Sequence, residues 1–147
     1  MKKGEVIYLG SDHAGFFLKR KIKDYFNKEN LKYEDVGSFD LKESDYVDYA
    51  KKVVAKLKKN KNSRGILICG TGTGMVVAAN RFKGIRAAVA YDKYSARMAR
   101  HDNDSNVLCL RGRKFSTRKN IKFVKIWLAE KFSGVERHKR RIRKLEA

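Results

Sequence analysis

The chain lacks several features that would mark particular classes of protein. It contains no proline and only two cysteines in 147 residues. Two thiols, Cys69 and Cys109, both at the ends of predicted strands, argue against a disulfide framework and suit a reducing compartment. No apolar stretch is long enough to span a membrane, and the first ten residues lead into a predicted strand rather than into a signal-peptide core. We therefore expect a cytoplasmic protein.

Acidic residues are also scarce, because 16 Asp and Glu face 36 Lys and Arg and leave a net charge of +20. Such an excess raises the question of nucleic-acid binding. Most of the positive charge, however, is spread along the faces of predicted helices, which favours a solvated surface. The length and the 42% hydrophobic content fit one soluble domain over residues 1–147, in which 135–147 forms a basic C-terminal helix or tail.

Strand and helix periodicities alternate regularly along the chain. The predicted strands are 5–10, 32–36, 65–68, 86–90 and 106–110. The predicted helices are 14–30, 46–60, 75–80, 92–101 and 117–132. This alternation indicates an α/β fold with a five-stranded parallel sheet that is covered by helices on both faces.

The most informative segment is GILICGTGTGM, from Gly65 to Met75. An apolar strand stops at Cys69, at the edge of a parallel sheet where ligands usually bind. Three alternating glycines follow, Gly70, Gly72 and Gly74, so backbone N–H groups can face an anion at the start of the next helix. We expect the thiol there to ionise readily. The segment predicts a cysteine that acts as a base or nucleophile beside developing negative charge.

Three more polar clusters lie near the ends of predicted elements and are candidates to meet Cys69 in one crevice. Ser11–His13 could hold sugar hydroxyls, or Ser11 or Asp12 could simply cap the next helix. The segment 101–106 (HDNDSN) is rich in polar groups, although alone such a run is more commonly a surface turn. Arg137 and Arg141 present two guanidinium groups on one helix face, an arrangement that suits a phosphate. A basic terminal helix, however, usually just exposes its charged side chains to solvent.

Six segments spread in order over nearly the whole chain carry a family resemblance: SDHAG at 11–15, the cluster of Asp45, Tyr46 and Tyr49, ICGTGTGM from Ile68, YSARMAR from Tyr94, NDSNVL from Asn103 and ERH from Glu136. In combination they resemble the ribose-5-phosphate isomerase B and galactose-6-phosphate isomerase family. The resemblance implies a Rossmann-like three-layer α/β/α sandwich, a homodimer that can pair into a tetramer, and active sites built across the subunit interface. It also implies a metal-independent aldose–ketose isomerisation of a phosphorylated sugar, without a cofactor.

The resemblance assigns roles that agree with the residue chemistry. Isomerisation moves a proton between C1 and C2 through an enediolate, and Cys69 matches the carbon base. The N–H groups around Gly70–Gly74 are placed to stabilise the enediolate. Thr71 resembles the hydroxyl that passes a proton between the substrate oxygens. Asp12 and His13 resemble the ligands of the sugar hydroxyls, Tyr46 resembles a wall of the pocket, and Asn103 resembles a substrate-binding residue. The phosphate contacts implied by the resemblance are Arg113, Arg137, His138 and Arg141.

One departure from the family pattern affects ring opening. The ring-opening histidine of the family directly precedes the asparagine that matches Asn103, whereas here Asp102 holds that place and His101 lies one position earlier. Three alternatives follow: Asp102 does the acid–base work, the turn shifts so that His101 reaches the ring oxygen, or another histidine takes over. A second departure, Val47 in place of a common proline, is expected to affect only loop stiffness.

The predicted reaction interconverts ribose 5-phosphate and ribulose 5-phosphate, a step of the pentose phosphate pathway, with allose 6-phosphate or galactose 6-phosphate as alternative substrates. A rival of another class is a nucleotide- or nucleic-acid-binding module. Asp92 supports it, because it lies about 20 residues beyond the glycines, where a dinucleotide fold places its ribose-binding acid. The spacing GxGxG, its position after the third strand and the presence of Cys69 argue against it.

Overall fold

The computed structural model describes residues 1–146 and contains one five-stranded sheet in the order β2-β1-β3-β5-β4. All neighbouring strands are parallel. The strands are β1 (Ile7–Ser11), β2 (Tyr33–Asp35), β3 (Arg64–Cys69), β4 (Ala87–Val89) and β5 (Val107–Arg111). Each lies within or overlaps one of the five predicted ranges, so the predicted α/β fold with a parallel sheet is confirmed.

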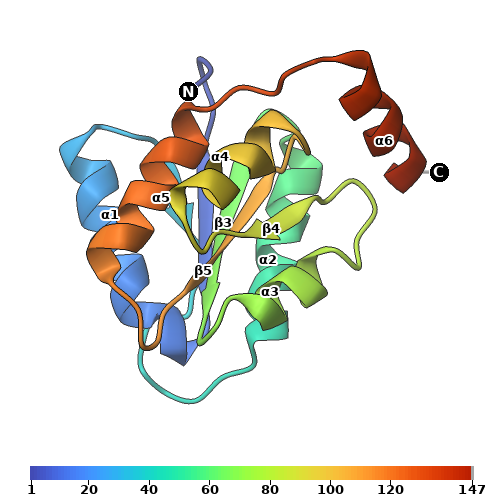
Figure 1. Cartoon of the computed structure of the whole chain (residues 1–147). Coiled ribbons are helices and arrows are strands. Elements are labelled where there is room, and N and C mark those ends of the chain that lie inside the picture. The colour runs from blue at the N-terminus through green and yellow to red at the C-terminus, as the bar shows by residue number, and fades with distance from the viewer. Residues whose placement is uncertain (147) are drawn as a thin grey trace.

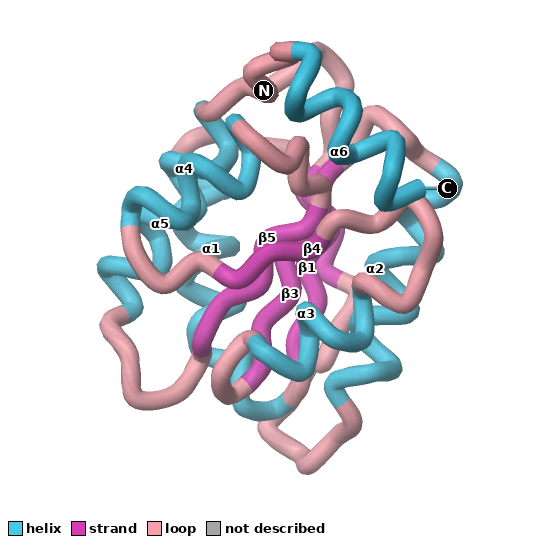
Figure 2. The backbone as a smooth tube through the Cα atoms, turned by 45° about the vertical axis from the view of Figure 1, so that its right-hand side comes forward, coloured by secondary structure: helices cyan, strands magenta, loops and turns pink. Residues whose placement is uncertain are grey.

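The helices are α1 (Phe16–Lys28), α2 (Tyr46–Lys59), α3 (Thr73–Ala79), α4 (Lys93–His101), α5 (Thr117–Ala129) and α6 (Glu136–Glu146), and a 3-10 turn at His13–Gly15 precedes α1. One face of the sheet packs against α1, α4 and α5, and the other packs against α2 and α3 (Figures 1 and 2). The result is the three-layer sandwich. None of the helices described over residues 1–146 has the length and apolar character needed to cross a membrane.

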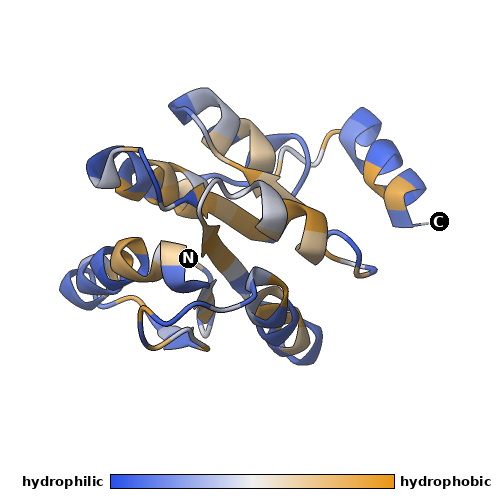
Figure 3. Cartoon of the chain, turned by 90° about the horizontal axis from the view of Figure 1, so that it is seen from below, coloured by the Kyte–Doolittle hydropathy of each residue, from blue (hydrophilic) through white to orange (hydrophobic). Residues whose placement is uncertain are grey.

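The central strand explains why both faces of the sheet need cover. All six residues of β3 are buried, because successive side chains point to opposite faces and each face has its own apolar core. Ile66 and Ile68 belong to the core under α1, α4 and α5, whereas Leu67 and Cys69 belong to the core under α2 and α3. Figure 3 shows the same pattern, with apolar strands in the middle and hydrophilic residues on the outer helix surfaces.

Several helix ends differ from the sequence prediction. The helix predicted at 75–80 begins two residues earlier, at Thr73, because Gly72 adopts a left-handed φ of 82° and caps it. The helix predicted at 117–132 ends at Ala129, since Glu130 is already extended. The helix predicted from residue 14 begins as a 3-10 turn that Asp12 caps. Propensity alone sets such ends poorly, because caps and tertiary contacts decide them.

Helix α6 stands apart from the three layers in Figure 1. Its far end is tied back by Glu146, which accepts hydrogen bonds from Arg86 at 3.2 Å and from the Gly84 N–H at 3.1 Å. Its near end is tied back by His138, which is only 4% exposed. Between these anchors its basic side chains point into solvent, and Leu145 is 68% exposed. This helix therefore contributes little to the core of its own chain.

Candidate active site

Cys69 is the last residue of β3, at the carboxyl edge of the sheet. Its side chain is buried, and the Gly72 N–H donates a hydrogen bond to Sγ at 3.2 Å. This is the one hydrogen bond that the described residues make to the Cys69 side chain, and in it the sulfur is the acceptor. The glycine loop therefore directs a backbone donor at the sulfur of Cys69.

The glycines of the loop allow close approach of two side chains. A Cβ on Gly74 would lie 2.9 Å from the Tyr46 ring, so only glycine lets that ring cover the start of α3. Gly70 lies beside the Arg113 side chain, and its carbonyl accepts a hydrogen bond from the Arg113 N–H at 3.1 Å. The loop thus brings an aromatic wall and a guanidinium to the same edge as Cys69.

Two residues after β1 lie at this edge as well. The Asp12 N–H donates to the carbonyl of Ile68, next to Cys69, at 3.2 Å. One oxygen of the Asp12 carboxylate accepts a hydrogen bond from the Gly15 N–H at 3.1 Å, so Asp12 does cap the following turn. Nδ1 of His13 accepts from the Ser44 N–H at 3.2 Å, which leaves Nε2 as the donor of a neutral imidazole. The second carboxylate oxygen of Asp12 and Nε2 of His13 take no part in these two hydrogen bonds, so both atoms can contact a substrate.

We call this first group the carboxyl-edge site. It comprises Asp12, His13, Tyr46, Cys69, Gly70, Thr71, Gly72, Gly74 and Arg113. Thr71 is exposed there, and its hydroxyl accepts a hydrogen bond from the Thr73 N–H at 3.2 Å. In Figure 1 the loop between β3 and α3 lies at the bottom of the molecule.

The segment 101–106 lies at the opposite edge. Helix α4 follows β4 and precedes the parallel strand β5, so it runs back from the carboxyl edge and ends near the amino edge. The expectation that this segment meets Cys69 in one crevice is therefore wrong within a single chain. Connectivity decides this, because a crossover helix must return the chain to the start of the next parallel strand.

At the amino edge, His101, Asp102 and His138 form what we call the histidine cluster. His101 Nδ1 lies 2.7 Å from Oδ1 of Asp102, and His138 Nε2 lies 3.7 Å from the same oxygen. The hydrogen bond from His101 lowers the pKa of Asp102, and the neighbouring His138 and Arg137 side chains lower it further. Asp102 therefore stays a carboxylate that orients His101 and leaves the other ring nitrogen of His101 free.

Asn103, Arg137 and Arg141 lie near this cluster in the chain, and all three are exposed. The two arginines are one turn apart on α6, so both can approach one anion. They cannot act on a substrate that sits at Cys69 of the same chain, because they lie at the amino edge of the sheet and Cys69 lies at the carboxyl edge. Of the three arginines predicted to hold phosphate, only Arg113 belongs to the carboxyl-edge site.

Ser133 is a residue that the sequence did not single out. Its hydroxyl lies 2.6 Å from Nδ1 of His138, and its N–H donates to the carbonyl of His101 at 2.9 Å. It therefore ties both histidines of the cluster to the segment between α5 and α6. A lone serine in a connecting segment carries no sequence signal, because the contact depends on where α4 and α6 end.

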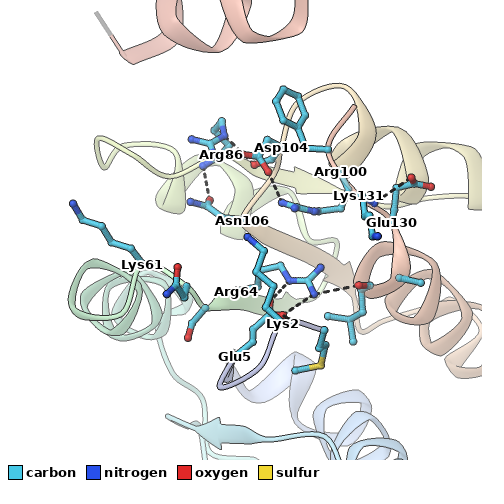
Figure 4. A pocket seen from close by; sticks show the side chains of 16 residues that line it. Lys2, Glu5, Lys61, Arg64, Arg86, Arg100, Asp104, Asn106, Glu130 and Lys131 are labelled. Atoms are coloured by element: carbon cyan, nitrogen blue, oxygen red, sulfur yellow. Dashed lines mark hydrogen bonds and ion pairs between the residues drawn. The ribbon is translucent and has the colours of Figure 1, made fainter. Parts of the chain in front are cut away.

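The amino edge also contains a cavity of about 740 Å³ that includes no predicted site residue (Figure 4). Its arginines are paired with acids: Arg64 with Glu5, and both Arg86 and Arg100 with Asp104. Arg64 also donates to two carbonyls at the end of α5. We interpret these contacts as a structural network that holds the ends of α4 and α5, because each of the three arginines already has an acidic partner.

The rival nucleotide-binding interpretation loses its main support. The Asp92 carboxylate accepts a hydrogen bond from the Ser95 N–H at 2.6 Å, and the Asp92 N–H donates in return to the Ser95 hydroxyl at 3.1 Å. This reciprocal pair is the capping box of α4, so Asp92 has a structural role that explains its presence.

Comparison with known proteins bears on the same question. A family model described as Ribose/Galactose Isomerase matches residues 7–145. The probable ribose-5-phosphate isomerase B of Mycoplasma pneumoniae is 41% identical over the whole chain and 97% of its own length. The crystal structure of a ribose 5-phosphate isomerase from Thermotoga maritima superposes with a TM-score of 0.93 at 43% identity, covering 97% of this chain and 98% of that one.

A third neighbour is a crystal structure of ribose-5-phosphate isomerase B from Mycoplasma genitalium with bound ribulose-5-phosphate. It has a TM-score of 0.92 and 39% identity, and the match covers 97% of this chain and 95% of that one. Family model, sequence relatives and structures agree over nearly the full length. The chain described here belongs to the ribose/galactose isomerase family.

Proposed function

We propose that this protein is an aldose–ketose isomerase that interconverts ribose 5-phosphate and ribulose 5-phosphate. The observation that carries the proposal is the position of Cys69, at the end of a buried central strand with a backbone N–H directed at its sulfur. The names of the similar proteins support the pentose phosphate as substrate. Allose 6-phosphate and galactose 6-phosphate remain the alternatives within the family, because a six-carbon sugar needs only a longer pocket.

The proposed proton transfer uses the carboxyl-edge site. The Cys69 thiolate removes the proton from C2 of the open-chain aldose, and the electron pair forms an enediolate whose charge spreads to the carbonyl oxygen. Free N–H groups of the loop 70–74 stabilise that oxygen, an effect worth about 3 to 4 kcal/mol for a good donor. Thr71 moves a proton between the two oxygens. The Cys69 thiol then returns its proton to C1, which completes the ketose and regenerates the thiolate.

Ring opening is assigned to His101, with Asp102 as its positioning residue. The 2.7 Å contact between Nδ1 and the carboxylate fixes the ring and its tautomer, so Nε2 can exchange a proton with the ring oxygen. This favours the second of the three alternatives that the sequence leaves open.

The proposed active site needs two copies of the chain. Because the carboxyl-edge site and the histidine cluster lie at opposite edges of one sheet, one sugar phosphate cannot reach both in a single chain. We infer a homodimer in which the histidine cluster, Asn103, Arg137 and Arg141 of one subunit complete the carboxyl-edge site of the other. Such dimers can pair into a tetramer. A cytoplasmic location fits a metabolic enzyme of this kind.

Activity on a panel of pentose and hexose phosphates tests the substrate assignment, with Cys69→Ser as the inactive control. We expect ribose 5-phosphate to give the highest kcat/KM. A higher kcat/KM on a hexose phosphate would make that sugar the assigned substrate. Activity on none of these sugar phosphates would refute the proposed isomerase function.

Mixing two inactive variants tests the shared site. Cys69→Ser and His101→Ala, dissociated and reassociated together, form mixed dimers in which one of the two sites is intact. About a quarter of the wild-type activity should return if subunits mix at random. No recovery in a mixture that demonstrably contains mixed dimers would place both residues in a site within one chain.

A further inference from the structure

The histidine cluster combines ligand types that bind transition metals. Among residues 1–146 it is the one group of three or more His, Cys, Asp or Glu side chains whose ligand atoms lie close together, all within 4.8 Å of one another. Two imidazoles and one carboxylate suit Zn²⁺ and its first-row neighbours, and they leave coordination positions open. This set arises from the two residues at which the chain departs from the family pattern, His101 and Asp102.

The distances are close to those that a bound ion requires. Ligand atoms about 2.0 to 2.2 Å from a tetrahedral zinc lie roughly 3.4 Å from each other. Here the two pairs at the Asp102 oxygen are 2.7 and 3.7 Å. All three ligand atoms lie within 4.8 Å of one another, so a bound ion would draw the widest pair together by up to about 1.4 Å. The side chains of His101 and Asp102 are 42% and 39% exposed and are free to make that movement. The His138 side chain is 5% exposed and is the fixed member.

The orientation of His138 is fixed by a hydrogen bond of the kind that metal-binding histidines commonly make. A ligating histidine usually donates its second N–H to an oxygen, which sets the ring orientation and leaves the first nitrogen free to bind. Ser133 Oγ lies 2.6 Å from His138 Nδ1 and can accept that N–H, so Nε2 keeps its lone pair directed at Asp102. The Val135 N–H donates to the same hydroxyl at 3.3 Å and helps to fix it.

We propose that His101, Asp102 and His138 bind a divalent transition-metal ion of the Zn²⁺ type, with Ser133 as the positioning residue. The ion is an inhibitor rather than a cofactor, because it occupies His101 and Asp102. This last point rests on the proposed function, whereas the binding itself does not.

Metal binding is measured directly on the substrate-free protein, with Zn²⁺ by titration calorimetry and with Co²⁺ by its visible absorption. Wild type should take up one ion per chain, and Asp102→Asn and His138→Gln should abolish this. Ser133→Ala should weaken affinity by about 10- to 100-fold, and Ser133→Thr should restore it, since the hydroxyl acts only through His138.

The chain contains matched controls. It has three histidines, so His13→Gln removes the one outside the cluster. Cys69→Ser removes the thiol of the carboxyl-edge site, because a cysteine is the other strong zinc ligand type there. Both variants should bind the metal like wild type. Thermal unfolding of every variant without metal shows whether a loss of binding is a loss of fold.

Two results obtained with the variants would overturn the site. The first is undiminished binding in a folded His138→Gln variant, and the second is equal loss in His13→Gln or Cys69→Ser. Absence of any binding by wild type would also refute it and would leave the isomerase proposal intact. If binding stands, Zn²⁺ should inhibit turnover of the cyclic sugar and chelation should reverse this. Inhibition that persists unchanged in His138→Gln would mean that the ion acts elsewhere, most directly at Cys69.

Discussion

Replacing Cys69 by serine is the most direct test of the carbon base. The structure makes the substitution informative, because the one hydrogen bond to the Cys69 side chain among the described residues comes from the Gly72 N–H. A serine hydroxyl becomes an effective base only when a neighbouring group accepts its proton. The Gly72 N–H is a donor, so it can stabilise an anion but cannot generate one from serine.

The expected loss follows from the value of a positioned base. General-base catalysis contributes about 10² to 10⁴ in rate, so Cys69→Ser should raise the barrier by roughly 3 to 5.5 kcal/mol. The fold should persist, because the serine hydroxyl is smaller than the thiol and can accept the same N–H. We expect a change of only about 1 kcal/mol in the free energy of unfolding.

Exchange of the substrate C2 proton with deuterated solvent, followed by NMR, measures the proton transfer itself. Thermal unfolding monitors the fold in parallel. Cys109→Ala is the matched control, because burial raises the pKa of that thiol and keeps it away from substrate. The control should exchange at nearly the wild-type rate. Near-wild-type exchange in folded Cys69→Ser would show that Cys69 is not the base.

Further substitutions test three other parts of the site: the phosphate contact, the ring-opening pair and the packing of the glycine loop. Arg141→Ala should raise KM more than it lowers kcat, because a phosphate contact acts on the ground and transition states alike, and an unchanged KM would move the phosphate site elsewhere. His101→Ala and Asp102→Ala should slow turnover of the cyclic sugar and spare C2 exchange on an open-chain aldehyde, with Asp102→His tolerated; equal loss on both forms would refute the ring-opening assignment. Gly74→Ala should displace the Tyr46 ring, which lies 2.9 Å from the added Cβ, and cost about 1 to 3 kcal/mol of stability with a higher KM; an unchanged protein would show that the ring moves freely.

The sequence could identify the residues that are candidates for ring opening but could not choose between them. The order of His101, Asp102 and Asn103 shows that the usual histidine position holds an acid, and it leaves three alternatives open. The contact between His101 and Asp102 favours one of them, because a carboxylate that orients an imidazole leaves the imidazole as the proton donor. Neighbouring residues at the end of a helix can point in several directions, so their spacing alone could not decide this.

The sequence by itself determined the alternation of strands and helices and the chemistry at the end of β3. Both are local properties of the chain. Periodicity indicates which side chains are buried, and alternating glycines after a cysteine indicate a strand end whose backbone N–H groups can bind an anion. The tertiary structure decided which groups meet. It put Asp12, Tyr46 and Arg113 beside Cys69, and it carried the histidine cluster to the opposite edge, because each crossover helix must return the chain to the start of the next parallel strand.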